Sequence, residues 1–245
     1  MLQVEPNWWQ TLFDDTYLLT DSRSVCDDDL TCREVDFLVS HLRLEKSERI
    51  LDLCGGHGRH SLELARRGYR FLTVLDYSGF LLRHGKRRAE QEALPVHFVR
   101  SDARGVGCAG GRFDCVLMLA NSFGYFMDDR ENLRVLREAR RLCGHGGRLL
   151  LDLLEREHVV RRFRSFSCHR ASEEVAVTRE RERDEKSIRV RETVIAGNGR
   201  IVRENTYCER LYTEQDLDSL LRESGISHVR LHKNFTSHAR AGDYG

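Results

Sequence analysis

Apolar and polar residues alternate along the chain in two rhythms, and the first of them predicts a layered α/β fold. Up to about residue 154, short apolar runs of strand length alternate with longer stretches that have apolar residues at helical spacing. The expected strands are 49–53, 70–76, 96–103, 113–120 and 147–154, and the expected helices are 31–44, 59–69, 78–93 and 128–142. Because parallel neighbours need crossover connections, this order predicts a doubly wound, mostly parallel sheet with helices on both faces.

The second rhythm begins past residue 160, where apolar and charged residues alternate one by one. Ile188 and Val190 alternate with arginines, and an Asn198-Gly199 pair follows as a tight-turn signal. These features predict an antiparallel hairpin, and residues 168–186 are expected to add a third strand to a small meander. The charge run 179–186 is interpreted as the solvated face and tip of that strand.

Helix-end signals support the predicted elements. Thr31 and Ser78 are expected to cap the helices that follow them, and Gly68 is expected to close the helix over 59–69. Thr213 and Asp216 resemble a capping box with Asp in place of Glu. That box begins a helix over 213–225, and a final strand is expected over 227–235.

The domain division follows from these rhythms. Residues 1–30 are predicted to be an N-terminal aromatic lid segment, and residues 161–212 an antiparallel β insertion over the active site. Residues 31–160 and 213–245 are predicted to form the core.

Charge and composition exclude several kinds of partner. Lys and Arg total 40 against 39 Asp and Glu, with the two signs interspersed, so nothing favours nucleic acid or an anionic membrane. No apolar run approaches the roughly 20 residues that cross a bilayer, and the start lacks a signal-peptide pattern, so a cytoplasmic location is expected. The eight cysteines contain no C-x-x-C pair. We therefore expect free thiols and no metal site.

Candidate chemistry gathers at the ends of the first three strands. Asp52, Asp76 and Asp102 stand at or near those ends, and a glycine-rich turn follows the first strand. Ligands of an open parallel sheet bind outside the carboxyl ends of its strands. Asp76 also follows the glycine turn at close to the spacing of about 20 residues at which an acid binds a ribose in this architecture.

The glycine spacing discriminates between two classes of nucleotide ligand. A dinucleotide fingerprint reads G-x-G-x-x-G, but Ser61 takes the third glycine position here. Asp52, before the turn, would sit badly near a pyrophosphate and well near a cationic amino group. A ligand with adenine, ribose and an ammonium but no phosphate is S-adenosylmethionine. A nicotinamide-dependent oxidoreductase stays open as an alternative enzyme class.

At this point the segments "ILDLCGGHGRHSLELARRGY", "VLDYS", "VRSDA" and "FDCVLMLANSFGYF" resemble the successive motifs of class I S-adenosylmethionine-dependent methyltransferases. The resemblance runs from about residue 35 to residue 235 and implies S-adenosylmethionine as cofactor and S-adenosylhomocysteine as product. In that family the glycine loop packs against the methionyl part, the second acid binds the ribose and the third meets the adenine edge. The implied cofactor-binding residues are Tyr17, Asp52, Gly55, Gly56, Gly58, Asp76, Tyr77, Asp102, Ala103 and Leu119.

Two features depart from the family pattern. Cys54 occupies the first glycine position of the loop, so the backbone there must accept a β-carbon unless Gly55 supplies the freedom instead. The family's sheet also closes with an antiparallel hairpin, and this sequence reaches residues 235–245 where the last strand of that hairpin is expected to begin.

The methyl acceptor is predicted only in outline. The loop 119–126 lies next to the expected methyl position, where Asn121 could orient a hydroxyl or an amine and its aromatic residues could wall the substrate or merely pack the loop. Tyr17 is the preferred lid residue, although the same aromatic segment could simply dock on the core. Substrate-site candidates are Trp9, Asn121, Phe123, Tyr125, Tyr207 and Arg210. Candidates for catalysis are Asn121, Tyr125, His57 and His169, none of which can be assigned as a base.

The sequence therefore predicts methyl transfer to a nitrogen or oxygen of a small molecule by in-line displacement. Transfer to carbon or to a protein, and a non-catalytic S-adenosylmethionine-binding protein, stay open. The β meander offers a surface for a homodimer, which no sequence feature decides.

Overall fold

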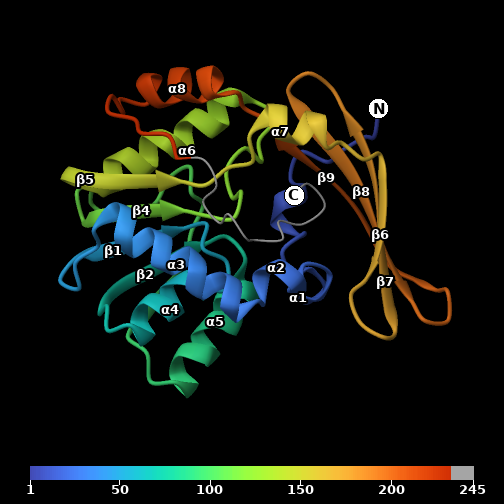
Figure 1. Ribbon diagram of the computed structural model, residues 1–245, viewed down its shortest axis with the longest axis horizontal. Coiled ribbons are helices and arrows are strands. Elements are labelled where there is room, and N and C mark those ends of the chain that lie inside the picture. The colour runs from blue at the N-terminus through green and yellow to red at the C-terminus, as the bar shows by residue number, and fades with distance from the viewer. Residues whose placement is uncertain (233–245) are drawn as a thin grey trace.

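Within residues 1–232, the main sheet is parallel and has five strands (Figure 1). This computed structural model describes residues 1–232, apart from the side chains of residues 23 and 24. The strands lie in the order β3-β2-β1-β4-β5, and every neighbouring pair is parallel. They are β1 (Arg49–Leu53), β2 (Phe71–Asp76), β3 (Val96–Arg100), β4 (Phe113–Met118) and β5 (Cys143–Leu151). The predicted doubly wound fold is confirmed.

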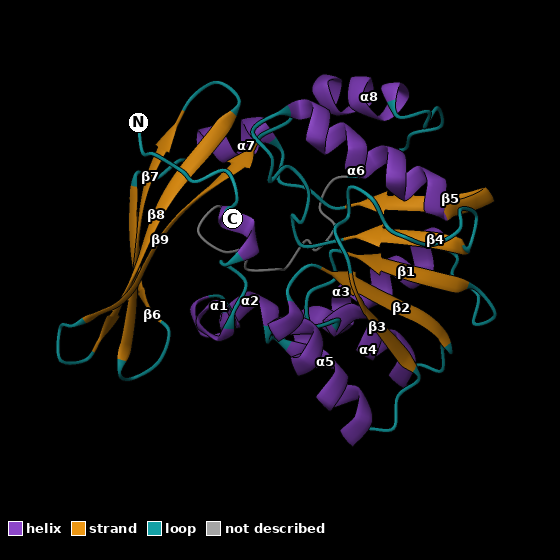
Figure 2. Ribbon diagram, turned by 180° about the vertical axis from the view of Figure 1, so that it is seen from behind, coloured by secondary structure: helices purple, strands orange, loops and turns teal. Residues whose placement is uncertain are grey.

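Helices cover both faces of this sheet (Figures 1 and 2). On one face lie α3 (Asp28–Leu42), α4 (Arg59–Arg66) and α5 (Gly79–Gln91), and on the other lie α6 (Asp129–Leu142) and α8 (Glu214–Glu223). Successive side chains of β1 point to opposite faces of the sheet and pack against both helix layers. Ile50 packs in the cluster with Leu64 of α4, and Leu51 packs in the cluster with Leu136 of α6. All four side chains are fully buried.

The helix ends follow the predicted signals with one exception. Ser78 accepts the amide of Leu81, and Thr213 forms the capping box with Asp216 as predicted. Thr31 is not the N-cap of α3: Asp27 accepts the Leu30 amide, and the Thr31 hydroxyl donates to the Asp27 carbonyl from inside the helix. Asp27, four residues before Thr31, is therefore the N-cap of this helix.

A second, antiparallel sheet follows β5 and stands beside the first (Figure 2). Its strands are β6 (Phe166–Arg170), β7 (Val175–Arg183), β8 (Ser187–Ala196) and β9 (Ile201–Arg210), in sequence order, and α7 (Arg156–Arg161) precedes them. The antiparallel meander is confirmed with four strands rather than the three expected. The fourth is β6, which pairs with the outer side of β7.

The interpretation of residues 179–186 as a solvated face is wrong for two of its arginines. Arg179 is 8% exposed and Arg181 is 4% exposed. Strand alternation places both on the same face of β7 as buried Val177, while Glu180 and Glu182 point the other way. The inner face of the second sheet therefore mixes apolar and charged residues.

The N-terminal segment fills the space between the two sheets. It contains η1 (Trp8–Gln10), α1 (Asp15–Thr20) and α2 (Ser22–Val25), and Figure 2 shows α1 and α2 between the antiparallel sheet and the helices of the core. Trp8, Trp9 and Leu12 are buried there with Cys208 of β9. The N-terminal segment and β9, which are far apart in the sequence, thus pack against each other.

Residues 227–232, where a final strand was expected, have no regular secondary structure. Val229 and Leu231 are exposed, so the apolar alternation of this stretch does not mark a buried strand face. The remainder of that expected strand, and the question of how the sheet closes, lie outside the described residues.

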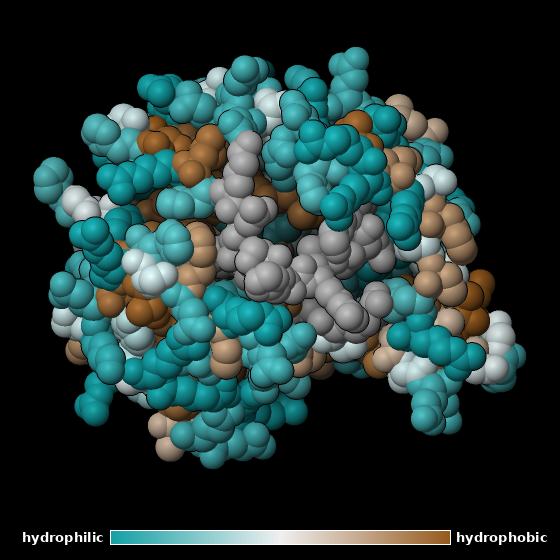
Figure 3. Space-filling view, in the orientation of Figure 1, coloured by the Kyte–Doolittle hydropathy of each residue, from teal (hydrophilic) through white to brown (hydrophobic). Residues whose placement is uncertain are grey.

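The face seen in Figure 3 is largely hydrophilic, with apolar residues in scattered groups. Within residues 1–232, no helix combines the length and the apolar composition that a membrane crossing requires.

Candidate active site

A pocket opens where the first strands of the parallel sheet end, and the N-terminal segment covers it. The loops after β1, β2, β3 and β4 all contribute to its wall. Of the residues predicted for the site, those that line the pocket are Trp9, Tyr17, Asp52, Gly55, Gly56, His57, Asp76, Tyr77, Asp102, Ala103, Leu119, Phe123 and Tyr125. Gly58, Asn121, His169, Tyr207 and Arg210 lie outside this lining.

The loop after β1 is held in an unusual backbone conformation. Cys54, Gly56 and Gly58 have φ values of 59°, 58° and 73°, in the left-handed region. The expectation that Gly55 would supply the freedom for Cys54 is wrong, because Cys54 itself adopts the positive φ. Gly55 is required for space instead, since a Cβ there would lie 2.6 Å from the Asp52 Cγ atom.

Gly58 shapes the loop from outside the pocket. A Cβ at this position would lie 2.9 Å from Val74 Cγ2 on β2. The absence of a side chain therefore lets α4 begin close against the sheet.

Asp52 ends β1 as a buried carboxylate. It is 1% exposed, and its Oδ2 accepts a hydrogen bond from the Ser61 hydroxyl at 3.0 Å. Its Oδ1 is buried without a hydrogen-bond partner among the residues that the structure describes. Burial raises the pKa of Asp52. An unpaired buried acceptor on the wall of a pocket fits a ligand that brings a hydrogen-bond donor.

Asp76 ends β2 and joins two backbone segments. Its Oδ2 accepts the Gly56 amide at 2.8 Å, and its Oδ1 accepts the Ser78 amide at 2.8 Å. Burial raises the pKa of Asp76, and these two amides oppose that rise. The carboxylate keeps acceptor capacity for a ligand beyond its bonds to the backbone.

Asp102 follows β3 and pairs with an arginine that sequence reasoning missed. The Arg104 guanidinium bonds to Asp102 at 2.6 Å and to Glu131 of α6 at 2.6 Å. Partial burial raises the pKa of Asp102, but Arg104 outweighs burial and holds it below its usual value. Arg104 also lies over the rings of Trp9 and Phe126, at 5.2 and 4.6 Å from their centroids. It therefore ties β3, α6 and the N-terminal segment together.

Aromatic rings form the opposite wall of the pocket. Trp9 meets Tyr77 edge-on at 4.7 Å, Phe13 meets Tyr17 edge-on at 5.0 Å, and Phe13 stacks on Tyr125 at 5.6 Å. Burial raises the pKa of both Tyr17 and Tyr125, so their hydroxyls stay protonated as donors. The predicted lid residue Tyr17 thus shares a wall with the loop after β4.

The two sheets hold the N-terminal segment from both sides. From the core, the Ser78 hydroxyl donates to the Phe13 carbonyl at 2.6 Å. From the second sheet, Arg179 pairs with Asp21 at 2.9 Å and His169 Nε2 contacts the Thr20 carbonyl at 3.0 Å. His169 is therefore engaged with the backbone of α1 rather than with the pocket.

The other predicted site residues outside the lining also contact neighbouring protein groups. Asn121 donates to Glu209 at 3.1 Å and accepts the Leu154 amide at 3.2 Å. Tyr207 packs against Trp8, with centroids 5.7 Å apart, and Arg210 bonds to Asp129 at 3.1 Å.

His57 lines the pocket as a neutral residue. It is 6% exposed, and burial, with the nearby charge of Arg59, lowers its pKa to about 4. The next histidine, His60, contacts Glu34 at 2.8 Å, and Arg59 bonds to the same carboxylate. Sequence reasoning missed Glu34 because it lies within a helical stretch far from the glycine loop.

Comparison with known proteins favours S-adenosylmethionine over a nicotinamide dinucleotide as the ligand of the pocket. Residues 50–147 match the family model described as a methyltransferase domain. This similarity agrees with the predicted class I S-adenosylmethionine-dependent methyltransferase. The matched segment begins in β1 and ends within β5, so it includes the glycine loop and all three acids.

Curated relatives match over somewhat less than half of the chain. A glycine/sarcosine N-methyltransferase from Parasynechococcus marenigrum is 29% identical over 120 residues, which cover 49% of this chain and 42% of that protein. The ubiquinone/menaquinone biosynthesis C-methyltransferase UbiE from Roseobacter denitrificans is 36% identical over 107 residues, which cover 42% and 41%. The chain thus spans less than half the length of these relatives.

Solved structures resemble the fold of this chain over most of its length. An amino pentose methyltransferase from Micromonospora echinaspora, with S-adenosylmethionine bound, gives a TM-score of 0.67 at 19% identity. The alignment covers 88% of this chain and 90% of that one. At this identity the likeness shows a shared fold.

The site fits S-adenosylmethionine as the methyl donor. Asp52 offers a buried acceptor without a described partner, which suits the donor's ammonium, and Asp76 keeps lone pairs for ribose hydroxyls. Arg59, the cation next to the loop, is already paired with Glu34 and is not available for a phosphate.

Proposed function

We propose that this protein transfers the methyl group of S-adenosylmethionine to a nitrogen or an oxygen of a small molecule. The observation that carries the proposal is the composition of the pocket. One wall consists of the glycine loop and the acids at the strand ends, and the other consists of aromatic residues from the N-terminal segment and the loop after β4. The first wall suits the donor and the second suits an organic acceptor.

The relatives support a small acceptor but differ in the atom methylated. By their names, one methylates the nitrogen of glycine and sarcosine and another methylates carbon in quinone biosynthesis. The structural neighbour is named for an amino pentose. None of the three names refers to a protein or a nucleic acid as acceptor.

The proposed mechanism depends on positioning. Bound S-adenosylmethionine supplies a methyl group on a positively charged sulfur, ready for in-line displacement. In this proposal Asp76 orients the ribose, Asp52 receives the ammonium, and the rings of Phe13, Tyr17 and Tyr125 exclude water from the methyl group. No charge has to be stabilised on the protein for a neutral amine, whereas a hydroxyl acceptor needs a base.

Two measurements test the proposal. Titration calorimetry with S-adenosylmethionine, and with NADH as the matched alternative, should give binding of the first alone. Mass spectrometry should then detect S-adenosylhomocysteine and a product heavier by one methylene when the protein is incubated with a panel of amines, phenols and sugars. Binding without turnover on any acceptor would instead favour a non-catalytic role, and NADH binding would favour an oxidoreductase. A cytoplasmic location and a homodimer stay predictions from the sequence.

A further inference from the structure

We infer that the acceptor is an amine, and that Glu209 binds the amine and takes its proton before methyl transfer. This inference rests on the proposed methyltransferase function and names its substrate class. It assigns the acceptor side of the site to a residue of the second sheet, which sequence reasoning did not single out.

Glu209 lies near the end of β9 on the inner face of the second sheet. In the β8–β9 pairing, Tyr207 stands opposite Val190 and Glu209 opposite Ile188, two buried residues of that face. Asn121 donates to Glu209 Oε2 at 3.1 Å and is the one hydrogen-bond partner of this carboxylate within residues 1–232. The Oε1 atom is thus left for another donor.

The hydrogen bond from Asn121 connects Glu209 to the wall of the pocket. Ala120 and Ser122, the neighbours of Asn121, both line the pocket, and Ala120 and Asn121 have left-handed φ values of 53° and 55°. Non-glycine residues adopt such values at a cost, so the backbone of the loop after β4 is strained at Ala120 and Asn121. Glu209 therefore contacts the loop whose neighbouring residues line the pocket, and its charge acts on Tyr125 of the pocket wall.

Aromatic rings continue from the pocket towards Glu209 and suit a cation. Tyr125 lines the pocket and meets Trp8 edge-on at 5.1 Å, and Trp8 meets Tyr207 at 5.7 Å. Tyr207 is two residues from Glu209 on the same face of β9. Ring faces attract ammonium groups, and a carboxylate among them adds the opposite charge. Neither the ring faces nor the carboxylate would favour a neutral hydroxyl acceptor over an ammonium.

The charge state of Glu209 agrees with proton transfer near neutral pH. Burial raises the pKa of Glu209 to about 7, against the lowering effect of nearby arginines. The charged and titratable groups around it are Arg179 and Arg181 of β7, Asp21 of the N-terminal segment, Tyr125 of the loop after β4 and Tyr207 of β9. A base with such a pKa can both accept and release a proton under physiological conditions.

The step balances without a further reactant. An ammonium acceptor gives one proton to the Glu209 carboxylate, which leaves a lone pair on the nitrogen. That lone pair forms the nitrogen–carbon bond while the carbon–sulfur bond breaks, and its electron pair stays on sulfur as the thioether of S-adenosylhomocysteine. The methylated ammonium product carries the positive charge that the sulfonium lost.

The test compares paired acceptors that differ only in amine against hydroxyl: methylamine and methanol, benzylamine and benzyl alcohol, glucosamine and glucose. S-adenosylhomocysteine formation is measured from pH 5.5 to pH 9 for wild type, Glu209→Gln, Glu209→Asp and the control Glu204→Gln. Glu204 lies on the same strand and is exposed. Calorimetry with S-adenosylmethionine and thermal melting accompany each variant, so that lost folding or lost donor binding is separated from lost chemistry.

We expect amines alone to be methylated, with an acid limb in kcat/KM near pH 7. Glu209→Gln should lower kcat/KM at least 100-fold and abolish that limb, with donor affinity changed less than twofold. Glu209→Asp should keep part of the activity and a limb, and Glu204→Gln should match wild type. Methylation of hydroxyl partners over amines, no turnover of any amine, or an unchanged profile in Glu209→Gln would overturn the inference alone. Absence of both donor binding and S-adenosylhomocysteine in wild type would overturn the proposed function.

Discussion

The carboxylate of Asp76 accepts the backbone amide of Gly56 at 2.8 Å, so the acid at the end of β2 braces the loop at the end of β1. The other oxygen of the same carboxylate accepts the Ser78 amide at the start of α5. One side chain therefore fixes the relative position of two segments that line the pocket. Its loss would change both the ligand contact and the shape of the loop.

We predict that Asp76→Ala abolishes S-adenosylmethionine binding, whereas His57→Ala only weakens it. Hydrogen bonds to charged groups contribute about 1.5–3 kcal/mol each, so losing two ligand contacts corresponds to about 100-fold in affinity or more. Isothermal titration calorimetry measures the change, with Asp218→Ala on α8, which does not line the pocket, as control. Unchanged affinity in the Asp76 variant would show that the donor binds elsewhere.

We predict that Cys54→Gly is more stable than Cys54→Ala by about 1 kcal/mol. Both substitutions remove the thiol, but alanine keeps a β-carbon at a φ of 59°, which costs about 1–2 kcal/mol for a residue other than glycine. Urea unfolding of the two variants isolates this backbone term. Equal stabilities would mean that the loop relaxes to another conformation when the sulfur is removed.

We predict that His57 makes folding stability fall in acid. Its folded-state pKa of about 4 lies below the ordinary value of 6.5, so the unfolded chain binds the extra proton as the pH falls. Between pH 7 and pH 5, this residue alone should lower the free energy of unfolding by about 2 kcal/mol. Urea unfolding at both pH values should show a smaller loss for His57→Gln than for wild type. The same loss in both proteins would assign the acid sensitivity to other groups.

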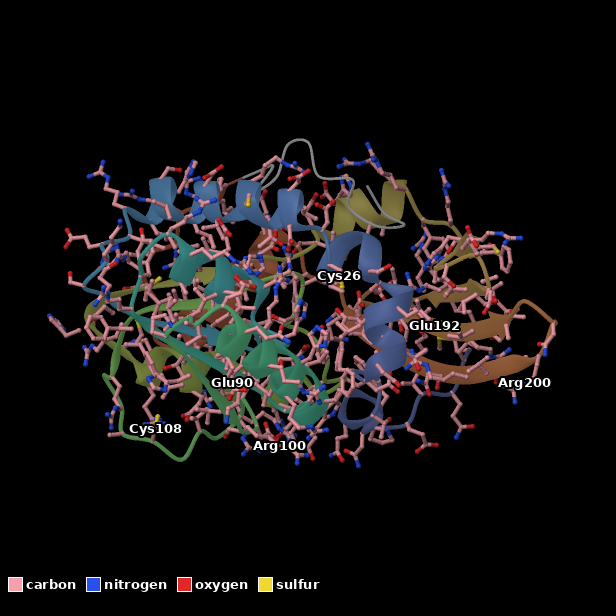
Figure 4. The ribbon with its side chains drawn as sticks, turned by 90° about the horizontal axis from the view of Figure 1, so that it is seen from below. Cys26, Glu90, Arg100, Cys108, Glu192 and Arg200 are labelled. Carbon is pink, nitrogen blue, oxygen red and sulfur yellow. The ribbon has the colours of Figure 1, made fainter. Side chains whose placement is uncertain are left out.

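We predict that Glu192→Ala destabilises the protein by about 3–5 kcal/mol and loosens the N-terminal segment. Glu192 is 2% exposed and lies on the second sheet beside α1 and α2 (Figure 4). It accepts from Arg179 at 2.9 Å and from Arg203 at 2.8 Å, and these arginines also hold Asp21 and Asp14. Removing it leaves two largely buried cations without their shared carboxylate.

Urea unfolding and hydrogen exchange of residues 14–21 measure these two effects of Glu192→Ala. The exposed Glu204→Ala on β9 is the control and should change stability by less than about 0.5 kcal/mol. Full amide protection of residues 14–21 in the Glu192 variant would show that the segment is held by its aromatic residues alone.

The pocket wall proposed for the donor could be predicted because its signals are local. Asp52, Asp76 and the glycines are fixed by strand ends and by backbone geometry, which a few neighbouring residues determine. The carboxylate pairing of Arg104, two residues after Asp102, is also local, but an arginine beside an acid is too common to single out.

The acceptor side could not be predicted because its contacts join distant segments. Glu209 meets Asn121 across 88 positions of sequence, and Arg179 meets Asp21 across 158. The sequence predicted exposed side chains for Arg179 and Arg181 because arginine is usually exposed. Both are buried, because their face of the second sheet is turned to the N-terminal segment. Alternation correctly indicated a strand, but it could not say which face the molecule would cover.

The two walls of the pocket come from separate stretches of the chain. Residues 52–103 supply the wall proposed for the donor, while residues before β1, the loop after β4 and the second sheet supply or support the wall proposed for the acceptor. Substitutions in the second of these walls can therefore change the acceptor and leave the residues proposed for the donor unchanged, in evolution as in protein engineering. Chimeras that keep the parallel sheet and replace the N-terminal segment together with β6–β9 should inherit the donor of one parent and the acceptor of the other.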